Sequence, residues 1–312
     1  MVPFFPTFGL QRLFHYCSIV ALVSSYVPYQ MELFWLEHVL SQQVNSANVR
    51  LSLMIPRHSP HLLAFRGPYQ QSVTATLAIV GDSNPFDVQP VELRAALQKT
   101  AVYLTTLSLC RIPTVSDRDI VAMEKAKSLE SLYLFMLPVR CEFLGSMTSD
   151  YLRFVTIRNC QLDDRSLLSL RCTRDVIELD VKDNQLTGIC VDGILRMTSV
   201  RTLNVSGNRI LGRDLERLSS HPSLESIVLS EESVENLDDW KALERLGSTA
   251  HVEIQGRRRN GDFATVTFGS GSICVSQYDG KDFRLKERKT LSDLTELDAD
   301  LFECRNRTRE GK

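Results

Sequence analysis

A short pattern of apolar residues recurs at a steady period along the centre of the chain. Each copy has apolar side chains at its first, fourth and sixth positions, as in LESLYL and VRTLNV. Because successive side chains of a strand point to opposite faces, this spacing is typical of a strand with one buried face. Successive copies start 23 to 25 residues apart, at Leu104, Leu129, Leu152, Val176, Val200 and Leu224, with a weaker seventh copy, TAHVEI, at Thr249. The pattern therefore predicts a stack of short strands, each followed by a return segment.

Two further positions of each copy, the ninth and the eleventh, also follow a rule. The eleventh is mostly apolar, and the ninth is Asn184 or Asn208 in the two most regular copies and Cys160 in a third. The chain must turn after each strand, which leaves buried backbone groups that an inward-pointing amide can hydrogen-bond. Glu232 occupies the ninth place of the sixth copy, where a buried charge would be costly. We therefore expect Glu232 to mark the end of the array.

This pattern resembles the LxxLxLxxNxL consensus of the leucine-rich-repeat family, in which the Asn place also accepts Cys. The resemblance covers residues 104–254, about half of the chain. It implies an α/β fold: a leucine-rich-repeat solenoid with a parallel β-sheet on the concave face, short helices on the convex face, and N- and C-terminal caps. Return segments such as Asp163-Asp164 before Leu167 and Leu168 fit short capped helices. The resemblance is specific for the fold and much less so for function.

The repeats divide the chain into four regions: an apolar leader (1–29), an N-terminal cap region (30–103), the repeat array (104–256) and a C-terminal hairpin cap with a charged tail (257–312). In the cap region, VRLSLMI and VTATLAIV predict strands, and MELFWLEHVL and VELRAALQ predict helices. TATLAIV begins about 30 residues before Leu104, which fits the repeat period poorly. DFATVTFGSGSICVSQY predicts two strands joined by a Gly-Ser turn. The tail from Lys281 mixes charges, and we expect helix and then disorder.

Net charge and cysteine content indicate which class of partner and which cellular compartment to expect. The formal net charge is -2, whereas proteins that bind nucleic acid usually have a basic excess, so we expect no nucleic-acid partner. No two of the eight cysteines have a CxxC spacing, which argues against a zinc ribbon or a thioredoxin-like site. Buried free thiols in a reducing compartment are the simpler interpretation, and this favours a cytoplasmic protein.

Residues 13–27, LFHYCSIVALVSSYV, contain no Asp, Glu, Lys or Arg. A signal peptide or a membrane anchor would look similar, although a spanning helix needs about 20 mostly apolar residues. A membrane-tethered protein is therefore the alternative, with residues 13–27 as its membrane contact. A buried first helix or a leader without fixed structure would also fit this segment.

Motifs of catalysis and metal binding are missing from the sequence. It has no GxxxxGK[ST], GxSxG or HExxH, so we expect no catalytic residue, no metal site and no cofactor. His58 and His61 form an HxxH pair without a further ligand nearby, which we interpret as an exposed loop. Cys190-Val191-Asp192 matches the CxD triplet of bacterial leucine-rich-repeat ubiquitin ligases. There the triplet lies in a separate catalytic domain, whereas here it lies inside the array.

The repeats therefore favour a non-catalytic scaffold, not an enzyme, that binds another protein through the concave face of the array. One alternative is a membrane-tethered or secreted recognition protein that uses the same array. A further alternative is a recognition arm for an enzyme whose activity lies in the N-terminal region, but that region is poor in titratable groups.

The third, fifth and seventh strand positions should point out from the concave sheet. Most are small and polar, but three are aromatic and fall on adjacent strands about 5 Å apart, which predicts one aromatic cluster. An exposed aromatic patch with a charged border is typical of a binding hot spot. The candidate partner-binding residues are Tyr133, Phe135, Phe154, Thr156, Arg158, Glu178, Asp180 and Lys182. The alternative is that the N-terminal cap covers this end of the face and buries the aromatic side chains.

Overall fold

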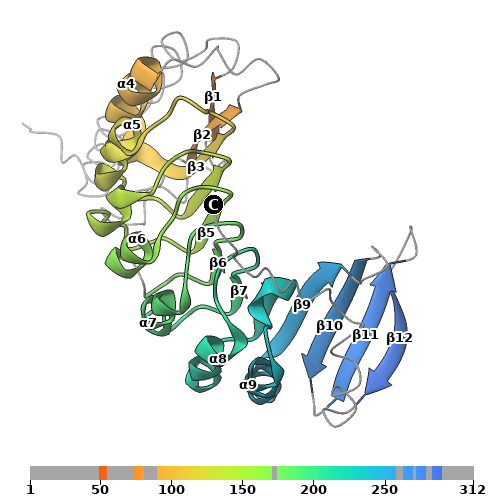
Figure 1. Cartoon of the computed structure of the whole chain (residues 1–312). Coiled ribbons are helices and arrows are strands. Elements are labelled where there is room, and N and C mark those ends of the chain that lie inside the picture. The colour runs from red at the N-terminus through yellow and green to blue at the C-terminus, as the bar shows by residue number, and fades with distance from the viewer. Residues whose placement is uncertain are drawn as a thin grey trace, which may run out of the picture.

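The computed structural model describes residues 49–54, 74–80, 90–170, 174–257, 263–269, 272–278 and 283–289. These residues include one twelve-stranded sheet, in which the strands lie side by side in chain order from β1 to β12. Figure 1 shows the array as an arc, with the strands along its inner side and short helices along its outer side. A mostly parallel sheet backed by short helices is compatible with the predicted leucine-rich-repeat solenoid.

All seven predicted repeat strands are present. They are β3 (Leu104–Cys110), β4 (Ser131–Phe135), β5 (Phe154–Arg158), β6 (Glu178–Asp180), β7 (Thr202–Asn204), β8 (Ser226–Ser230) and β9 (His251–Arg257). Each pairs in parallel with the next. The register aligns equivalent places of successive copies, so that Leu179 lies beside Leu203 and Leu203 beside Ile227. These three side chains are fully buried, which confirms the predicted inward face.

The return segments are short helices, as predicted. They are α5 (Asp117–Ile120), η3 (Val121–Lys125), η4 (Glu142–Gly145), α6 (Asp164–Ser169), η5 (Gly188–Cys190), α7 (Val191–Leu195), α8 (Gly212–Leu215), η6 (Glu216–Ser220), η7 (Glu231–Ser233) and α9 (Leu237–Gly247). The Asp163 side chain accepts a hydrogen bond from the Ser166 N–H and so caps α6. Buried leucines such as Leu167 and Leu243 face the sheet and complete the core.

The N-terminal end of the array continues the parallel sheet. The predicted strands form β1 (Val49–Met54) and β2 (Thr74–Val80), and VELRAALQ lies within helix α4 (Pro90–Thr100), followed by η2 (Ala101–Tyr103). β2 pairs in parallel with β3 despite its poor fit to the repeat period, while β1 pairs with β2 in the antiparallel sense. Arg94 of α4 joins this unit to the first repeat through Asp119, with Nη2 2.5 Å from Oδ1. The predicted helix MELFWLEHVL lies outside the described residues.

At the C-terminal end, the sheet changes from parallel to antiparallel at β9. The predicted hairpin is confirmed as β10 (Phe263–Gly269) and β11 (Ser272–Tyr278), with β10 also antiparallel to β9. The prediction of helix beyond Lys281 was wrong for β12 (Phe283–Lys289), which pairs with β11. The sequence FRLKERK has few apolar residues, so the alternation of apolar and polar positions that indicates a strand cannot be recognised in it. Such charged strands are typical of a sheet edge, where they discourage further pairing.

No helix in the described part of the chain is long and apolar enough to cross a bilayer. The predicted leader, including residues 13–27, lies outside that part.

Candidate functional site

The turns that follow the strands form one edge of the concave face. We call this edge the rim, and it comprises the seventh and eighth places of the copies. The eighth residue of five successive copies has a left-handed backbone conformation, with φ between 51° and 68°: Arg111, Met136, Asn159, Asp183 and Gly207. At this place a backbone N–H donates to the carbonyl at the seventh place of the next copy, as from Arg111 to Phe135 (2.9 Å) and from Met136 to Arg158 (3.0 Å). A row of equivalent turns therefore presents side chains at matching heights along the sheet.

Beneath this rim, the amide side chains of Asn184, which is half-buried, and Asn208, which is buried, hold the turns in place. The Asn184 Nδ2 donates to the carbonyls of Ile157 (2.6 Å) and Val181 (2.8 Å). Its Oδ1 accepts from the backbone N–H groups of Cys160 and Leu162, both at 3.2 Å. One side chain thus satisfies backbone groups of two copies, as the sequence predicted.

Asn208 repeats this arrangement one copy further on. Its Nδ2 donates to the Val205 carbonyl (3.0 Å), and its Oδ1 accepts from the Leu186 N–H (3.1 Å). The Cys160 Sγ lies 3.4 Å from a backbone carbonyl and makes the weaker version of the contact. Glu232 is exposed, so its carboxylate avoids the buried ninth place. The rigid rim therefore spans the copies that have Cys or Asn at this place.

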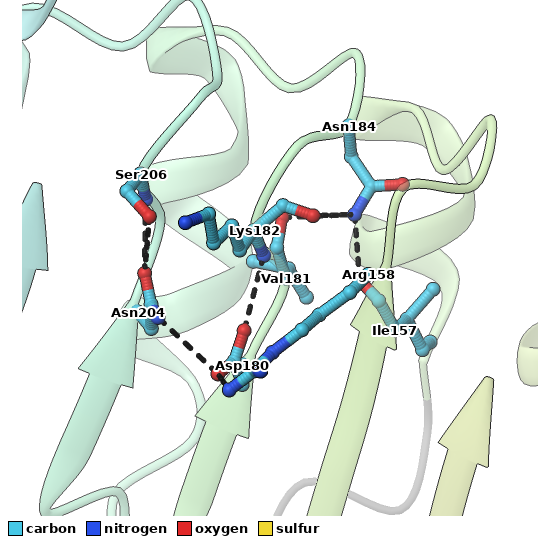
Figure 2. A network of polar contacts seen from close by, with 8 residues as sticks. All are labelled: Ile157, Arg158, Asp180, Val181, Lys182, Asn184, Asn204 and Ser206. Carbon is cyan, nitrogen blue, oxygen red and sulfur yellow. Dashed lines mark hydrogen bonds and ion pairs between the residues drawn. The ribbon is translucent and has the colours of Figure 1, made fainter. Parts of the chain in front are cut away.

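On the concave face itself, a polar network crosses strands β5 to β7 (Figure 2). The Arg158 guanidinium forms an ion pair with Asp180. Asp180 also accepts from the Asn204 Nδ2 (3.2 Å) and from the Lys182 backbone N–H (3.2 Å). Asn204 in turn accepts from the Ser206 hydroxyl (2.7 Å). The hydrogen bond to Asp180 raises the pKa of Arg158, so this guanidinium is a permanent positive charge.

The three predicted aromatic residues lie on the concave face of β4 and β5, but at three different heights. The register places Phe154 beside Ser131, Tyr133 beside Thr156, and Phe135 beside Arg158. Phe154 is 37% exposed, while Tyr133 and Phe135 are half-buried. No ring-to-ring contact joins these three within the described residues. The aromatics therefore form a diagonal across two strands instead of a stacked cluster.

The other candidate residues differ in how much surface they offer. Arg158 and Glu178 are exposed and Lys182 is half-buried. Thr156 and Asp180 are buried, at 6% and 4% exposure. A partner on this face would thus meet Arg158, Glu178 and Lys182 directly and would touch Thr156 and Asp180 little.

Three thiols of the array, those of Cys141, Cys160 and Cys190, are buried. Burial raises the pKa of Cys141 and of Cys190 well above the ordinary thiol value, and raises the pKa of Cys160 to about 11. The CxD triplet is split in space, because Cys190 is buried while Asp192 is exposed and pairs with Arg217 at 2.5 Å. These thiols are therefore protonated and poorly nucleophilic at neutral pH.

Within the described residues, no group of three or more His, Cys, Asp or Glu side chains is placed to bind a metal ion. His58 and His61, the HxxH pair, lie outside those residues.

Four residues that the sequence reasoning did not select as partner-binding lie at the rim or beside Asp180. Arg111 and Met136 are exposed at the eighth place, next to the candidate aromatic residues. Asn204 and Ser206 complete the network around Asp180. The signal for the rim was the constant spacing of the eighth place, which an analysis of the apolar positions alone passes over.

Comparisons with known proteins add little to this description. No protein-family model matches the chain, and no curated protein matches it. Among solved structures, an internalin from Listeria monocytogenes is similar over 51% of this chain and 43% of its own, with 16% identity and a TM-score of 0.39. The chain thus matches less than half of that protein's length.

Proposed function

We propose that the protein is a non-catalytic scaffold that binds another protein through the concave face of its repeat array. The contact centres on Phe154, Tyr133 and Phe135. The observation on which this rests is Phe154, an aromatic side chain 37% exposed on the open face of a sheet whose other outward positions are mostly polar.

The surroundings of Phe154 support a binding role. Its strand is fixed by parallel pairing on both sides, so the side chain is presented by a rigid element and little conformational entropy is lost when a partner binds. The polar groups beside it are already satisfied by one another, as in the Arg158–Asp180–Asn204 network. A partner can therefore cover them without leaving new buried groups unpaired.

The chemistry of the array supports the non-catalytic part of the proposal. Cys160 and Cys190 have raised pKa values and are buried, which is the opposite of an activated nucleophile. The one buried carboxylate on the concave face of β5 to β7, Asp180, is held by hydrogen bonds from three residues. Such a group is arranged for structure instead of proton transfer.

The test begins with affinity capture by the full-length chain, followed by calorimetry of each captured protein with folded variants. The paired variant Tyr133→Ala/Phe154→Ala removes two aromatic side chains from the concave face and should weaken binding by about 2 kcal/mol or more. The matched control, Val121→Ala/Ile189→Ala, also removes two exposed apolar side chains, from the convex segments η3 and η5. Equal affinity losses in the two pairs would contradict the concave site.

A further inference from the structure

Two cations lie at the rim of the concave face without an acidic partner. Arg111 follows β3 and is exposed, and Lys182 follows β6 and is half-buried. In the described part of the chain, neither has a carboxylate oxygen within 4.0 Å, whereas Arg158 between them pairs with Asp180. Unpaired surface cations are common, so the pair indicates a ligand only in combination with its neighbours.

Apolar side chains occupy the rim between these cations. Phe135 ends β4 and is half-buried, and Met136 follows it with 47% of its surface exposed. The backbone hydrogen bonds from Arg111 to Phe135 and from Met136 to Arg158 make the three turns immediate neighbours. The carboxylate at this edge, Asp183, lies against the turn at Gly207, on the side away from Met136. Along the rim from β3 to β6, the apolar residues of β4 therefore lie between Arg111 on one side and Arg158 and Lys182 on the other, and Arg158 is already paired with Asp180.

We propose that this rim binds an extended acidic segment of the partner protein. The segment has two carboxylates four positions apart with an apolar residue between them. Three steps between neighbouring strands separate Arg111 from Lys182, which is about 14 Å. An extended chain covers that distance in about four residues, since each adds at most about 3.3–3.6 Å. One carboxylate meets Arg111, the apolar side chain meets Phe135 and Met136, and the other carboxylate meets Lys182.

This inference rests on the proposed function, because it names the chemistry of the partner at the same face. Charge complementarity of this kind sets specificity and the association rate more than total affinity. Contacts with exposed cations are also screened by salt. The binding should therefore select acidic sequences and weaken as ionic strength rises.

The probe is a phage-displayed library of random dodecapeptides, selected on the full-length chain. We expect enriched peptides with the pattern acidic-x-apolar-x-acidic. Charge reversal at both rim positions, Arg111→Glu/Lys182→Glu, should weaken a selected synthetic peptide by about ten-fold or more in fluorescence polarisation. The control, Arg118→Glu/Arg165→Glu, makes the same change in net charge at exposed residues of the convex helices α5 and α6 and should change affinity less than about two-fold.

The milder pair Arg111→Gln/Lys182→Gln, which should give an intermediate loss, serves if the reversed pair fails to fold. Selection of peptides without acidic enrichment, selection of no peptide, or equal losses in the rim and convex pairs would overturn the inference. If selected peptides lack acidic residues but still lose affinity in Tyr133→Ala/Phe154→Ala, only the acidic rim is wrong. If neither the aromatic nor the rim variants affect binding, the concave site itself fails.

Discussion

Two buried threonines near the N-terminal end of the array differ in whether their hydroxyl groups have a partner. Thr100 and Thr105 are both 1% exposed. The Thr100 hydroxyl donates to the Ala96 carbonyl at 2.8 Å. Among the described residues, the Thr105 hydroxyl has no hydrogen-bond partner. Thr105 lies where the pairing of β2 with β3 skips one residue, since Ala75 is opposite Leu104 while Thr76 is opposite Thr106. The irregularity therefore coincides with an uncompensated polar group.

Replacing each threonine by the isosteric valine should have opposite effects on stability. Thr105→Val removes a hydroxyl that is buried in the folded state without a hydrogen bond there, and it should raise the free energy of unfolding by about 1 kcal/mol. Thr100→Val removes the hydrogen bond to the Ala96 carbonyl and should lower the free energy of unfolding by about 1 kcal/mol. Urea unfolding with an unchanged slope measures both. If Thr105→Val destabilises as much as Thr100→Val, the hydroxyl has a partner in solution.

His221 is a buried histidine whose two ring nitrogens are both engaged. The Ser223 N–H donates to Nδ1 at 3.3 Å, so the proton of the neutral ring is on Nε2, which donates to the Met197 carbonyl at 3.0 Å. Burial, the largest influence, lowers the pKa of His221 below its ordinary value of 6.5, and the backbone hydrogen bonds oppose it only in part. The folded state therefore binds this proton less readily than the unfolded state.

This lowered pKa predicts how stability depends on pH. As the pH falls below about 6.5, the unfolded chain takes up the proton first, so His221 makes the free energy of unfolding fall until the folded pKa is passed. Above about pH 6.5 the contribution of His221 to the free energy of unfolding is constant. In His221→Asn, the loss of stability between about pH 7.5 and pH 5 should be smaller than in the parent. Parallel stability curves for the two proteins across this range would show that His221 is not responsible.

At the scale of elements, the repeat strands were predictable because one rule fixes them all. The period sets which residues lie side by side, and the burial of Leu179 and Leu203 follows from it. The roles of Asn184 and Asn208 were also predictable, since a turn after a buried strand needs hydrogen-bond partners. Local pattern and tertiary packing agree in these copies.

The strand β2 shows where the period fails as a guide. The starts of β2 and β3 are 30 residues apart, and helix α4 and η2 lie in the connection between them. The register still aligns Leu77 with Leu107 and Ile79 with Leu109. Parallel pairing depends on the register between the strands and not on the length of the segment that connects them. A prediction based on a constant repeat length therefore does not identify this strand as part of the parallel sheet.

The candidate site was predictable only in part. The outward-pointing strand positions correctly predicted that Phe154, Tyr133 and Phe135 lie on the concave face. A cluster of rings also requires the same register position on the adjacent strands, and these residues have three different ones. The burial of Asp180 arises from contacts with Arg158 and Asn204 on the two neighbouring strands. Such contacts depend on side-chain reach between copies, which a repeat consensus does not encode.

At the scale of the whole molecule, the sheet joins two kinds of construction. From β2 to β8 each strand is followed by its own return segment, and from β9 to β12 the strands run back and forth (Figure 1). In a solenoid each unit contacts mainly its neighbours, so an open end would expose apolar surface. The antiparallel strands extend the sheet past the last repeat and protect that end.

Besides the pairing of β9 with β10, a side-chain contact between helix α9 and strand β10 joins the two parts. Trp240 and Phe268 are each 2% exposed, and their ring centroids are 5.9 Å apart. Gly247 allows this approach, because a Cβ there would lie 2.6 Å from the Cβ of Phe268. The last return helix therefore packs directly on the antiparallel strands, and we expect the array and these strands to unfold together.

Phe268→Ala tests this coupling, with Trp240 as the reporter. The chain has two tryptophans, so a Trp35→Phe background leaves fluorescence from Trp240 alone. Removing the buried ring should lower the free energy of unfolding by about 3–5 kcal/mol. Because the contact joins neighbouring units, the loss should shift a single urea transition seen identically by fluorescence and by far-UV circular dichroism. The outcome against coupling is a separate early fluorescence change that leaves the circular dichroism midpoint where it was, since the antiparallel strands would then unfold without affecting the array.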